Sequence, residues 1–402
     1  MSELSEIKNL RDLVKDRIEG EILEQAAKRL VPPGENYGSI IYKVDFSVKN
    51  DDSTETYHAV AKCTPPNKVT QEVFNTQITF KTEIGWYTTV IPTYKEFQKE
   101  KGVKEADFFQ HFLGARISLD PDSDVVDEYG CILTKNLISL GYKNVDRHEG
   151  FDLKTAKSVL RDLAKYHAIP WALKQQNPKL FAEKILPFMP KYPNSDDDSV
   201  DFMASVKQNL RNMPEITEYL DRVIHVLDNN KPFDFEFVPR EPWATITHTD
   251  FWSNNIMVTD EDEPKTIILD LQGTRYGSLA SDVLFLFALS IKLDVNEKHM
   301  DALIEHYWTN FVGTVKELDS DVTGLTYEGF LEELSLRAKS ELGHALFIGQ
   351  FIFLEKGVTH FDSSDKDFKK EDLDSSGNVE FGKKHRDRFS WVIKEFARRN
   401  WI

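Results

Sequence analysis

The stretch His248-Thr249-Asp250-Phe251-Trp252-Ser253-Asn254-Asn255 decides how this chain is interpreted, together with the apolar run Thr266-Ile267-Ile268-Leu269 that ends in Asp270. The first part has the pattern H-x-D-x-x-x-x-N, in which Asn255 follows Asp250 by five positions. A short loop of this kind directs several polar side chains to one place, and the strand behind it delivers a further carboxylate. The pattern therefore predicts a site built from Asp250, Asn255 and Asp270.

The types of side chain in this pattern suit one kind of chemistry. Phosphoryl transfer requires a carboxylate that faces the attacking hydroxyl, while an Asn and a second carboxylate ligate Mg²⁺ at the phosphates. The Asp-to-Asn spacing is that of a kinase catalytic loop. We therefore predict that Asp250 faces the acceptor hydroxyl and that Asn255 and Asp270 bind Mg²⁺.

His248 allows two interpretations. It is either a structural residue whose ring hydrogen-bonds the loop backbone, which we favour, or a catalyst. A rival assignment makes His248 and Asp250 metal ligands of a hydrolase, but the further His or Asp at helical spacing that such sites need does not follow.

Composition narrows the class of protein. The chain has 402 residues, which suffice for one large two-lobed unit or for two to three domains. Its formal charge is −17, and this argues against nucleic acid as a partner because phosphate backbones bind basic surfaces. Cationic substrates remain compatible with that charge, although simple solubility also explains it.

Cysteines and apolar segments point to a reducing compartment. The two cysteines, Cys63 and Cys131, lie in separate segments and form no C-x-x-C motif, so neither a disulfide framework nor a zinc site is predicted. Residues 1–20 have no apolar signal-peptide core, and the most apolar run, 283–291, is too short to span a bilayer. We expect a cytosolic protein without membrane insertion.

The first third of the chain has the pattern of a small lobe that binds a nucleotide. Apolar residues at four-residue steps predict a helix over 4–30, and strands are predicted over 39–49 and 56–64. A Gly-bearing turn precedes the first strand and includes Gly38 and Ser39, which would let backbone amides approach phosphates; an ordinary hairpin entry explains it equally well.

Lys62 ends the second predicted strand in the sequence Ala59-Val60-Ala61-Lys62, which is similar to the V-A-I-K of kinase strands. A Lys at the end of a strand is usually a solvated edge residue, but the downstream loop favours a Lys that pairs with phosphates and has an acidic partner on the next helix. Glu83 lies among apolar residues of that helix and is the expected partner, with Glu72 as a possible substitute. Ile91-Pro92 is predicted to stop the helix.

The rest of the chain is predicted to be mainly helical. Strands over 112–119 and 129–134 lead to Lys135-Asn136-Leu137, the expected hinge, where Lys135 and Leu137 would lie at the nucleotide. A helix is predicted over 154–167, and 194–199 and 363–377 are predicted as mobile surface loops. We therefore predict an α+β fold with a nucleotide-binding lobe at 1–135, an antiparallel sheet plus helix, and a helical lobe at 136–402 that carries the catalytic loop and substrate site.

Several segments together resemble the ecdysteroid-kinase-like family, within the choline kinase and aminoglycoside phosphotransferase group. They are Phe80-x-x-Glu83-x-x-x-Tyr87 with Ile91-Pro92, Leu137-x-x-Leu140-Gly141-Tyr142, Leu163-Ala164-x-x-His167-Ala168, His248-x-Asp250-x-Trp252-x-x-Asn255-Ile256-Met257, Leu269-Asp270-x-Gln272-x-x-Arg275-Tyr276-Gly277, and Asp282 followed by Leu284. The resemblance covers roughly residues 35–310 and implies a bilobal protein-kinase-like fold.

The resemblance implies a role for each matched position. Lys62 pairs with the α- and β-phosphates of ATP, Glu83 orients it, and Asp282 braces the catalytic loop. The chain departs from the family pattern at three places: the family commonly has Glu-Asp at Lys135-Asn136, often Gly at Thr249, and usually Phe at Leu271. None of these departures removes a phosphate or metal ligand, although the hinge change can alter nucleotide preference.

Two functions from different classes follow. The first is an ATP- and Mg²⁺-dependent kinase for an alcohol on a small molecule, by resemblance an ecdysteroid or a xenobiotic, with no obligate protein partner. The second is a catalytically silent, pseudokinase-type protein that binds an apolar small molecule. In the helical lobe, a substrate pocket could be lined by Leu342, Leu346, Gln350 and Phe353, or these residues are ordinary core. Neither the acceptor nor the oligomeric state can be inferred from the sequence.

Overall fold

The computed structural model describes residues 5–32, 38–190, 203–231, 237–355, 362, 364, 365, 369 and 380–402. The predicted loop 194–199 lies outside these residues, as do most of loop 363–377 and residues 34–37 of the glycine turn. The chain forms two compact units. Unit 1 comprises Met1–Thr88, Phe109–Tyr142 and Glu355–Gly377, and unit 2 comprises Thr89–Phe108, Lys143–Leu354 and Asn378–Ile402.

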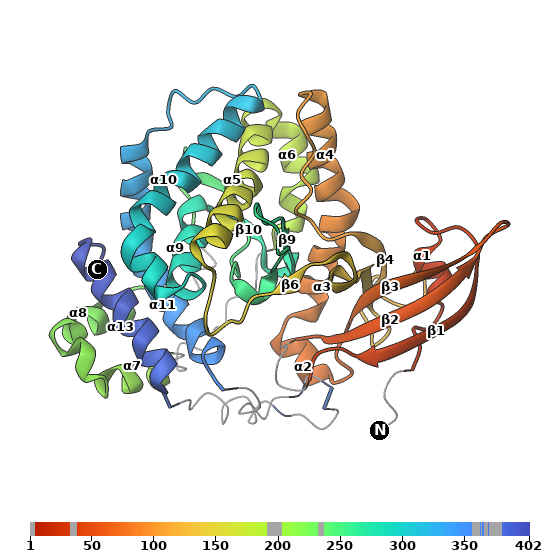
Figure 1. Cartoon of the computed structure of the whole chain (residues 1–402), viewed down its shortest axis with the longest axis horizontal. Coiled ribbons are helices and arrows are strands. Elements are labelled where there is room, and N and C mark those ends of the chain that lie inside the picture. The colour runs from red at the N-terminus through yellow and green to blue at the C-terminus, as the bar shows by residue number, and fades with distance from the viewer. Residues whose placement is uncertain are drawn as a thin grey trace. The chain divides into compact units, whose positions relative to one another are not determined.

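Unit 1 combines short helices with one sheet (Figure 1). Its elements are α1 (Leu10–Val14), β1 (Glu21–Arg29), β2 (Ile40–Lys49), β3 (Thr54–Cys63), α2 (Lys68–Val73), α3 (Thr76–Gly85), β4 (Phe112–Arg116), β5 (Cys131–Lys135) and a 3-10 turn (Leu137–Leu140).

The sheet of unit 1 is antiparallel, with strand order β1-β2-β3-β5-β4. The strands predicted over 39–49 and 56–64 are confirmed as the β2–β3 hairpin, whose turn closes with a bond from Asn50 N to Ser53 O (2.9 Å). Those predicted over 112–119 and 129–134 are confirmed as β4 and β5, each within a few residues of its predicted ends. β3 therefore lies in the middle of the sheet, and the backbone of Lys62 is paired with β2 on one side and with β5 on the other.

The predicted helix over 4–30 is wrong. Only Leu10–Val14 is helical, and Glu21–Arg29 forms β1, which pairs with β2. Gly20 has a φ of 116°, a conformation that a helix cannot continue through. β1 is rich in Glu, Ala, Gln and Lys, which favour helices, but pairing with the exposed edge of β2 overrides that weak local preference.

The apolar residues that suggested the long helix are nonetheless buried together. Leu10, Leu13, Val14 and Ile18 pack on one face of the sheet, against Val44, Phe46, Val48, Ala59, Ala61, Leu113, Cys131 and Leu133. The spacing at four-residue steps thus marks one buried face, although the helix on it is short.

Gly114 of β4 allows α1 to approach the sheet this closely, because a Cβ there would overlap the carbonyl oxygen of Leu13. We expect Gly114→Ala to lower the free energy of unfolding by about 1–3 kcal/mol, since the backbone of α1 must shift. Chemical denaturation of the variant measures the loss. Gly313→Ala is the matched control: nothing lies within 4 Å of its added Cβ, and in a helix interior it should be neutral or stabilising by roughly 0.5–1 kcal/mol. Equal stability of the two variants would contradict the prediction.

The predicted stop at Ile91-Pro92 is also wrong. Residues Trp86–Val90 form a π-helical turn after α3, and Ile91–Glu100 continues as α4. Pro92 lies in the first turn of α4, where a residue without a backbone N–H is tolerated because that N–H has no helical partner.

Unit 2 is mainly helical (Figure 1). Its elements are α4 (Ile91–Glu100), β6 (Lys143–Asn144), α5 (Leu153–Gln176), α6 (Pro178–Lys184), α7 (Ala204–Arg211), α8 (Leu220–Asn229), β7 (Ala244–Thr247), β8 (Ile256–Val258), β9 (Thr266–Ile268), β10 (Arg275–Ser278), α9 (Leu279–Leu289), α10 (Leu293–Glu317), α11 (Tyr327–Ile352) and α13 (Lys383–Arg398), with 3-10 turns at Leu186–Phe188, Pro214–Tyr219, Ser253–Asn255 and Leu271–Gly273.

Two small sheets, β7 with β10 and β6-β8-β9, lie among the helices of unit 2. The long helices α5 and α10 pack on each other, and α9 packs on α11 and on β7. α9 is buried almost throughout, which explains why its sequence is the most apolar of the chain. Among the described residues, no helix has the length and apolar character needed to cross a bilayer.

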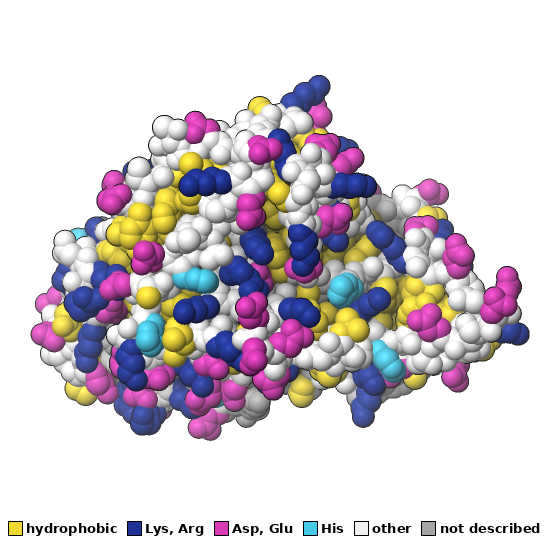
Figure 2. Space-filling model, turned by 45° about the horizontal axis from the view of Figure 1, so that its top comes forward, with side chains coloured by type: hydrophobic (Ala, Val, Ile, Leu, Met, Phe, Trp, Pro, Cys, Tyr) yellow, Lys and Arg dark blue, Asp and Glu magenta, His cyan; other side chains and the backbone are white. Residues whose placement is uncertain are grey.

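The predicted α+β fold is confirmed: one unit contains an antiparallel sheet with helices, and the other is mainly helical. The chain passes from unit 1 to unit 2 after Thr88, again after Tyr142 and a third time after Gly377. The predicted division into two lobes at residue 135 therefore stays a prediction. On the face drawn in Figure 2, basic and acidic side chains are interspersed. Exposed ion pairs such as Lys43–Asp45 each contribute little to stability.

Candidate active site

The loop after β7 is held by a carboxylate beneath it. Asp282, in the first turn of α9, accepts hydrogen bonds from the backbone N–H of His248 to Oδ2 (2.7 Å) and of Thr249 to Oδ1 (2.8 Å). Thr249 has a φ of 70°, which is unfavourable for a β-branched residue. Its hydroxyl also donates to the Gly273 carbonyl (2.8 Å), so these bonds stabilise a backbone conformation that glycine would adopt without strain.

Asp282 belongs to a buried chain of polar groups. Its Oδ2 lies 3.0 Å from His167 Nε2, and His167 Nδ1 lies 2.7 Å from the Tyr307 hydroxyl. Burial alone would raise the pKa of Asp282, but the hydrogen bond and charge of His167 outweigh it, and the pKa lies below its ordinary value. Burial, with the negative charge of Asp282, raises the pKa of Tyr307, so its hydroxyl keeps its proton.

His248 is occupied on both ring nitrogens. Nε2 donates to the Leu269 carbonyl (2.8 Å), so Nδ1 accepts the weaker bond from the Asp250 N–H (3.3 Å). A ring used in this way ties the loop to the end of β9. The structural interpretation of His248 therefore agrees with its contacts.

Asp250 and Asn255 are joined directly. The Asn255 Nδ2 donates to Asp250 Oδ2 (2.7 Å) and to the Asp250 carbonyl (2.9 Å). This orientation assigns the amide nitrogen to Asp250 and makes Oδ1 the acceptor atom of the Asn255 side chain. Burial and the negative charge of Asp270 raise the pKa of Asp250, so the two carboxylates are close enough to repel each other.

β9 brings Asp270 to the same loop. The Leu269 N–H donates to the Asn255 carbonyl (2.8 Å), and Asp270 follows with a φ of 60°, a left-handed conformation that Asp tolerates better than most residues. Gln272 Nε2 lies 3.3 Å from Asp270 Oδ2. Asp250, Asn255 and Asp270 are thus brought together as the sequence predicts, whereas their chemical roles stay predictions.

The donor atoms of this group fit a hard cation. Carboxylate and amide oxygens are the ligands that Mg²⁺ prefers, and Mg²⁺ is commonly held by one or two protein side chains together with substrate phosphates. Within the described part of the chain, no three His, Cys, Asp or Glu side chains are grouped so as to hold a metal ion.

In unit 1, Lys62 of β3 contacts Glu83 of α3. Their Nζ and Oε2 atoms are 2.6 Å apart, and the side chains are 13% and 3% exposed. Glu83 is therefore the acidic partner, and Glu72, the possible substitute, is exposed. Such a buried pair holds the Lys62 ammonium in one position, whereas the ammonium of a flexible surface lysine would not be fixed.

The other predicted nucleotide contacts also lie in unit 1. Gly38 has a φ of 76° and Ser39 is buried, and these are the described residues of the predicted phosphate loop. Lys135 is exposed at the end of β5 and Leu137 is buried. Asn136 caps the following turn by accepting from the Ile138 N–H (3.0 Å), a bond that the Asp of the family pattern would also make.

A family model confirms the relationship that these residues indicate. The model of the ecdysteroid kinase-like family matches residues 33–320, which is more than half of the chain. The chain belongs to the ecdysteroid kinase-like family. The predicted enzyme class, a kinase-like phosphotransferase acting on an alcohol, agrees with this membership.

Solved structures similar to this family member are phosphotransferases of distant sequence. One is a spectinomycin phosphotransferase in complex with ADP and spectinomycin (12% identity, TM-score 0.46, 98% of each chain covered). Another is a microcompartment-associated aminopropanol kinase (8%, 0.45, 93% of each chain), and a third is a choline kinase from Cryptosporidium parvum (8%, 0.44, 94% of this chain and 91% of that chain). Similarity at this level carries no argument about the acceptor. No curated protein matches the chain.

Sequence reasoning gave no role to several residues of the kinase-like site. His167 lies in the segment 163–168 that resembles the family, but its partner Asp282 is 115 residues away, so no local pattern indicates their contact. A second buried cluster on α11 consists of Arg337, Glu341 and His344, with Glu341 Oε1 3.2 Å from Arg337 and Oε2 3.2 Å from His344. Burial opposes ionisation of Glu341, but His344 and Arg337 prevail and lower its pKa to about 2.

The charge of His344 partly opposes the rise in the pKa of Asp250 that burial and Asp270 cause. The His344 ring stacks on Phe285 of α9 (4.4 Å between centroids). By contrast, the residues proposed from helical spacing as a pocket lining, Leu342, Leu346, Gln350 and Phe353, are 0–3% exposed and form ordinary core.

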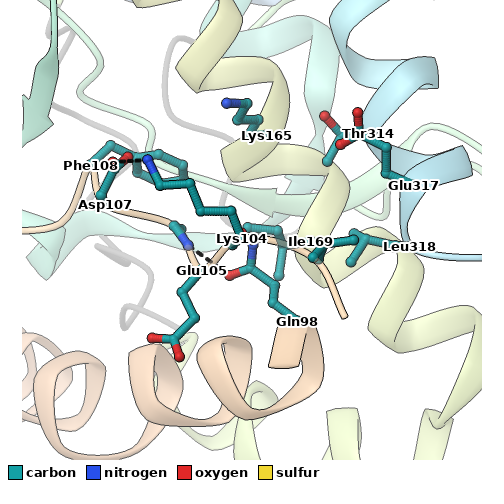
Figure 3. Close-up of a pocket in the computed structure, with 12 residues that line it drawn as sticks. Gln98, Lys104, Glu105, Asp107, Phe108, Lys165, Ile169, Thr314, Glu317 and Leu318 are labelled. Atoms are coloured by element: carbon teal, nitrogen blue, oxygen red, sulfur yellow. Dashed lines mark hydrogen bonds and ion pairs between the residues drawn. The ribbon is translucent and has the colours of Figure 1, made fainter. Parts of the chain in front are cut away.

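A small cavity of about 100 Å³ lies elsewhere in unit 2 (Figure 3). It is lined by α4, segment 103–108, α5 and the end of α10, and none of the predicted site residues lines it. Within its wall, Lys104 pairs with Asp107 (2.6 Å), and Gln98 accepts from the Ala106 N–H (3.0 Å). The same segment accepts the Ile268 N–H at the Phe108 carbonyl (2.8 Å), so it braces the strand that leads to Asp270.

Proposed function

We propose that this protein is an ATP- and Mg²⁺-dependent kinase that transfers the γ-phosphate to an alcohol hydroxyl of a small molecule. The joined group of Asp250, Asn255 and Asp270 in unit 2 is the observation that carries the proposal. Phosphoryl transfer depends mainly on positioning and on neutralising charge, and a loop in which Asn255 bonds the Asp250 carboxylate, with Asp270 brought beside it by β9, suits both tasks.

Each residue has a distinct task in this proposal. Asp250 orients the acceptor hydroxyl and takes its proton, while Asn255 holds the Asp250 carboxylate in place through Nδ2. The Asn255 oxygen and the Asp270 carboxylate would hold Mg²⁺. When bound, Mg²⁺ would supply positive charge that neutralises the phosphates during transfer.

The residues of unit 1 suit the nucleotide. Lys62, held by Glu83, would contact the α- and β-phosphates, and Gly38 and Ser39 would cover them. At the hinge, the N–H groups of Lys135, Asn136 and Ile138 already donate to the His111 carbonyl, the His58 carbonyl and the Asn136 side chain. We therefore expect the backbone N–H of Leu137 to meet adenine.

Family membership supports an ecdysteroid hydroxyl or the hydroxyl of a xenobiotic or secondary metabolite. A cytosolic location without an obligate protein partner agrees with such a role. The second candidate, a silent binding protein with the same fold, is favoured by one observation, the basic Lys135 at a hinge where the family has an acid.

Replacing Lys62 tests the nucleotide site. We expect Lys62→Met to lower kcat/KM for ATP by about 10²-fold or more, because a positioned cation at the phosphates is lost while the apolar length of the side chain is kept. Steady-state kinetics at varied Mg·ATP measure the effect. Lys43→Met, on the neighbouring strand β2 and 44% exposed, is the control and should leave kcat/KM unchanged. An unaltered kcat/KM in Lys62→Met would remove this residue from the site.

A mass-spectrometric screen tests the activity itself. The protein is incubated with Mg·ATP and a pool of steroids, amino alcohols and plant alcohols, with Asp250→Ala as the control. Appearance of a phosphorylated product with the intact protein alone is the expected result, and it also names the acceptor. A thermal-shift measurement accompanies the screen, since Mg·ATP at 100 times its Kd should stabilise the fold by about 2.7 kcal/mol. If no product forms and Mg·ATP does not stabilise the fold, the result would favour the silent binding protein.

A further inference from the structure

The two cysteines of the chain lie opposite each other in the sheet of unit 1. Cys63, the last residue of β3, pairs with Cys131, the first residue of β5. Cys131 in turn pairs with Arg116, the last residue of β4. The three residues therefore form one row across adjacent strands, although Cys63 and Cys131 are 68 positions apart in the sequence.

The hydrogen-bond pattern shows which kind of pair the cysteines form. The Thr64 N–H donates to the Gly130 carbonyl (3.2 Å), and the Asn136 N–H donates to the His58 carbonyl (2.8 Å). In the pairing of β3 with β5, the even-numbered residues of β3 thus occupy hydrogen-bonded positions. Cys63 and Cys131 therefore form a non-hydrogen-bonded pair. Cα atoms of such pairs are about 4.5 Å apart with side chains close together, which lies within the roughly 4.4–6.8 Å that a disulfide spans.

The surroundings of the Cys63 and Cys131 side chains also favour their oxidation. Cys131 is buried in the core beneath α1, and Cys63 is partly exposed, so a small oxidant can reach the pair. The hydrogen bond from the Cys63 thiol, aided by the charge of Arg116, lowers the pKa of Cys131, whereas donating this bond raises the pKa of Cys63. The thiolate, which is the nucleophile, is therefore favoured on one member of the pair.

We propose that Cys63 and Cys131 form an oxidisable dithiol that closes to an intramolecular disulfide when the protein meets a peroxide. One thiolate attacks a peroxide oxygen, the O–O bond breaks, and water leaves after taking up a proton, which gives a sulfenic acid. The second sulfur then attacks the sulfenic sulfur, the S–O bond breaks, and a second water leaves. In sum, two thiols and one hydrogen peroxide give one disulfide and two waters.

The disulfide would join β3 to β5 at the residue next to Lys62. Successive side chains of a strand point to opposite faces, so Lys62 projects from the face opposite the cysteines. The bond would therefore form without contacting the Lys62 side chain, while it fixes the end of the strand that carries it. The inference does not rest on the proposed kinase activity, because it concerns thiol chemistry alone.

The full chain is treated with hydrogen peroxide and then unfolded in denaturant that contains an alkylating reagent. Its intact mass is then measured by mass spectrometry. We expect the monomer to lose two hydrogens and both alkylation sites, and dithiothreitol to restore both sites. Peptide mapping should show Cys63 linked to Cys131. Cys63→Ser, at a partly exposed position that tolerates the change, should keep the Cys131 thiol or gain oxygen and never lose two hydrogens.

Three results would overturn the proposal. They are full alkylation of both cysteines after peroxide, addition of oxygen atoms without disulfide formation, and disulfide-linked dimers in place of the internal bond. If Cys63→Ser fails to fold, Cys63→Ala in the same assay supplies the control, since it removes the sulfur without introducing a hydroxyl.

Discussion

Asp270→Asn should reduce kcat for phosphoryl transfer by about 10²–10³-fold or more, the largest catalytic effect that we expect from a near-isosteric change in this chain. The substitution removes a negative charge and one oxygen from the proposed Mg²⁺ site. Asn tolerates the left-handed backbone conformation of this position (φ 60°) as well as Asp does, so the fold should persist. Steady-state kinetics over a range of Mg²⁺ concentrations measure the loss and should also show a higher Mg²⁺ requirement.

Asp262→Asn is the matched control for this change. Asp262 is exposed in the loop between β8 and β9, in the segment that leads to Asp270, and its replacement also removes one negative charge. It should leave kcat and the Mg²⁺ requirement unchanged. Near-normal turnover in Asp270→Asn, with a folded protein and the control active, would refute the metal assignment.

Asp282→Ala should have the largest effect on stability. Asp282 is 1% exposed and accepts from two backbone N–H groups and from His167. Removing it leaves buried donors without an acceptor, and breaking a buried charged network of this kind costs about 3–5 kcal/mol. We expect this decrease in the free energy of unfolding at pH 7, measured by chemical denaturation, together with loss of activity because Thr249 loses one bond that holds its strained backbone.

The pH dependence of this effect has a definite sign. The pKa of Asp282 is lowered in the folded protein, so its ionised form contributes stability above the unfolded pKa of about 3.9. That contribution is lost as the pH falls through the folded pKa. The difference between wild type and Asp282→Ala should therefore be full at pH 7 and shrink below about pH 4.

Asp260→Ala provides the control for stability. Asp260 is 84% exposed and pairs with Lys143 at 3.1 Å, so its loss should cost no more than about 1 kcal/mol. If Asp282→Ala proved as mild as this control, the buried network would not support the loop as we describe.

Local sequence predicted those parts of the fold in which neighbouring residues carry the signal. β2 and β3 alternate over long runs, and the Asn50–Ser53 turn joins them, so the hairpin was predictable. β1 was not, because its residues favour a helix and only its pairing with β2 makes it a strand. The same limit applies at Pro92, where the π-helical turn before it lets the chain enter a new helix.

The candidate site shows the same division. The spacing of Asp250 and Asn255 and the Asp after an apolar strand were sufficient to place three side chains together. The acidic partner of Lys62 was narrowed to two residues, and the contact at 2.6 Å selects Glu83. Roles that depend on residues far apart in the chain, such as His167 with Asp282, carry no local signal.

The sequence by itself thus determined the family and the α+β class, and it predicts the residues of the catalytic loop, because each depends on short-range spacing within one element or loop. Only the tertiary structure decided that residues 21–29 form a strand, that both ring nitrogens of His248 hydrogen-bond backbone groups, and that Cys63 lies opposite Cys131. These features arise from strand pairing and side-chain contact between distant segments, and their energies depend on neighbours that a linear pattern does not contain.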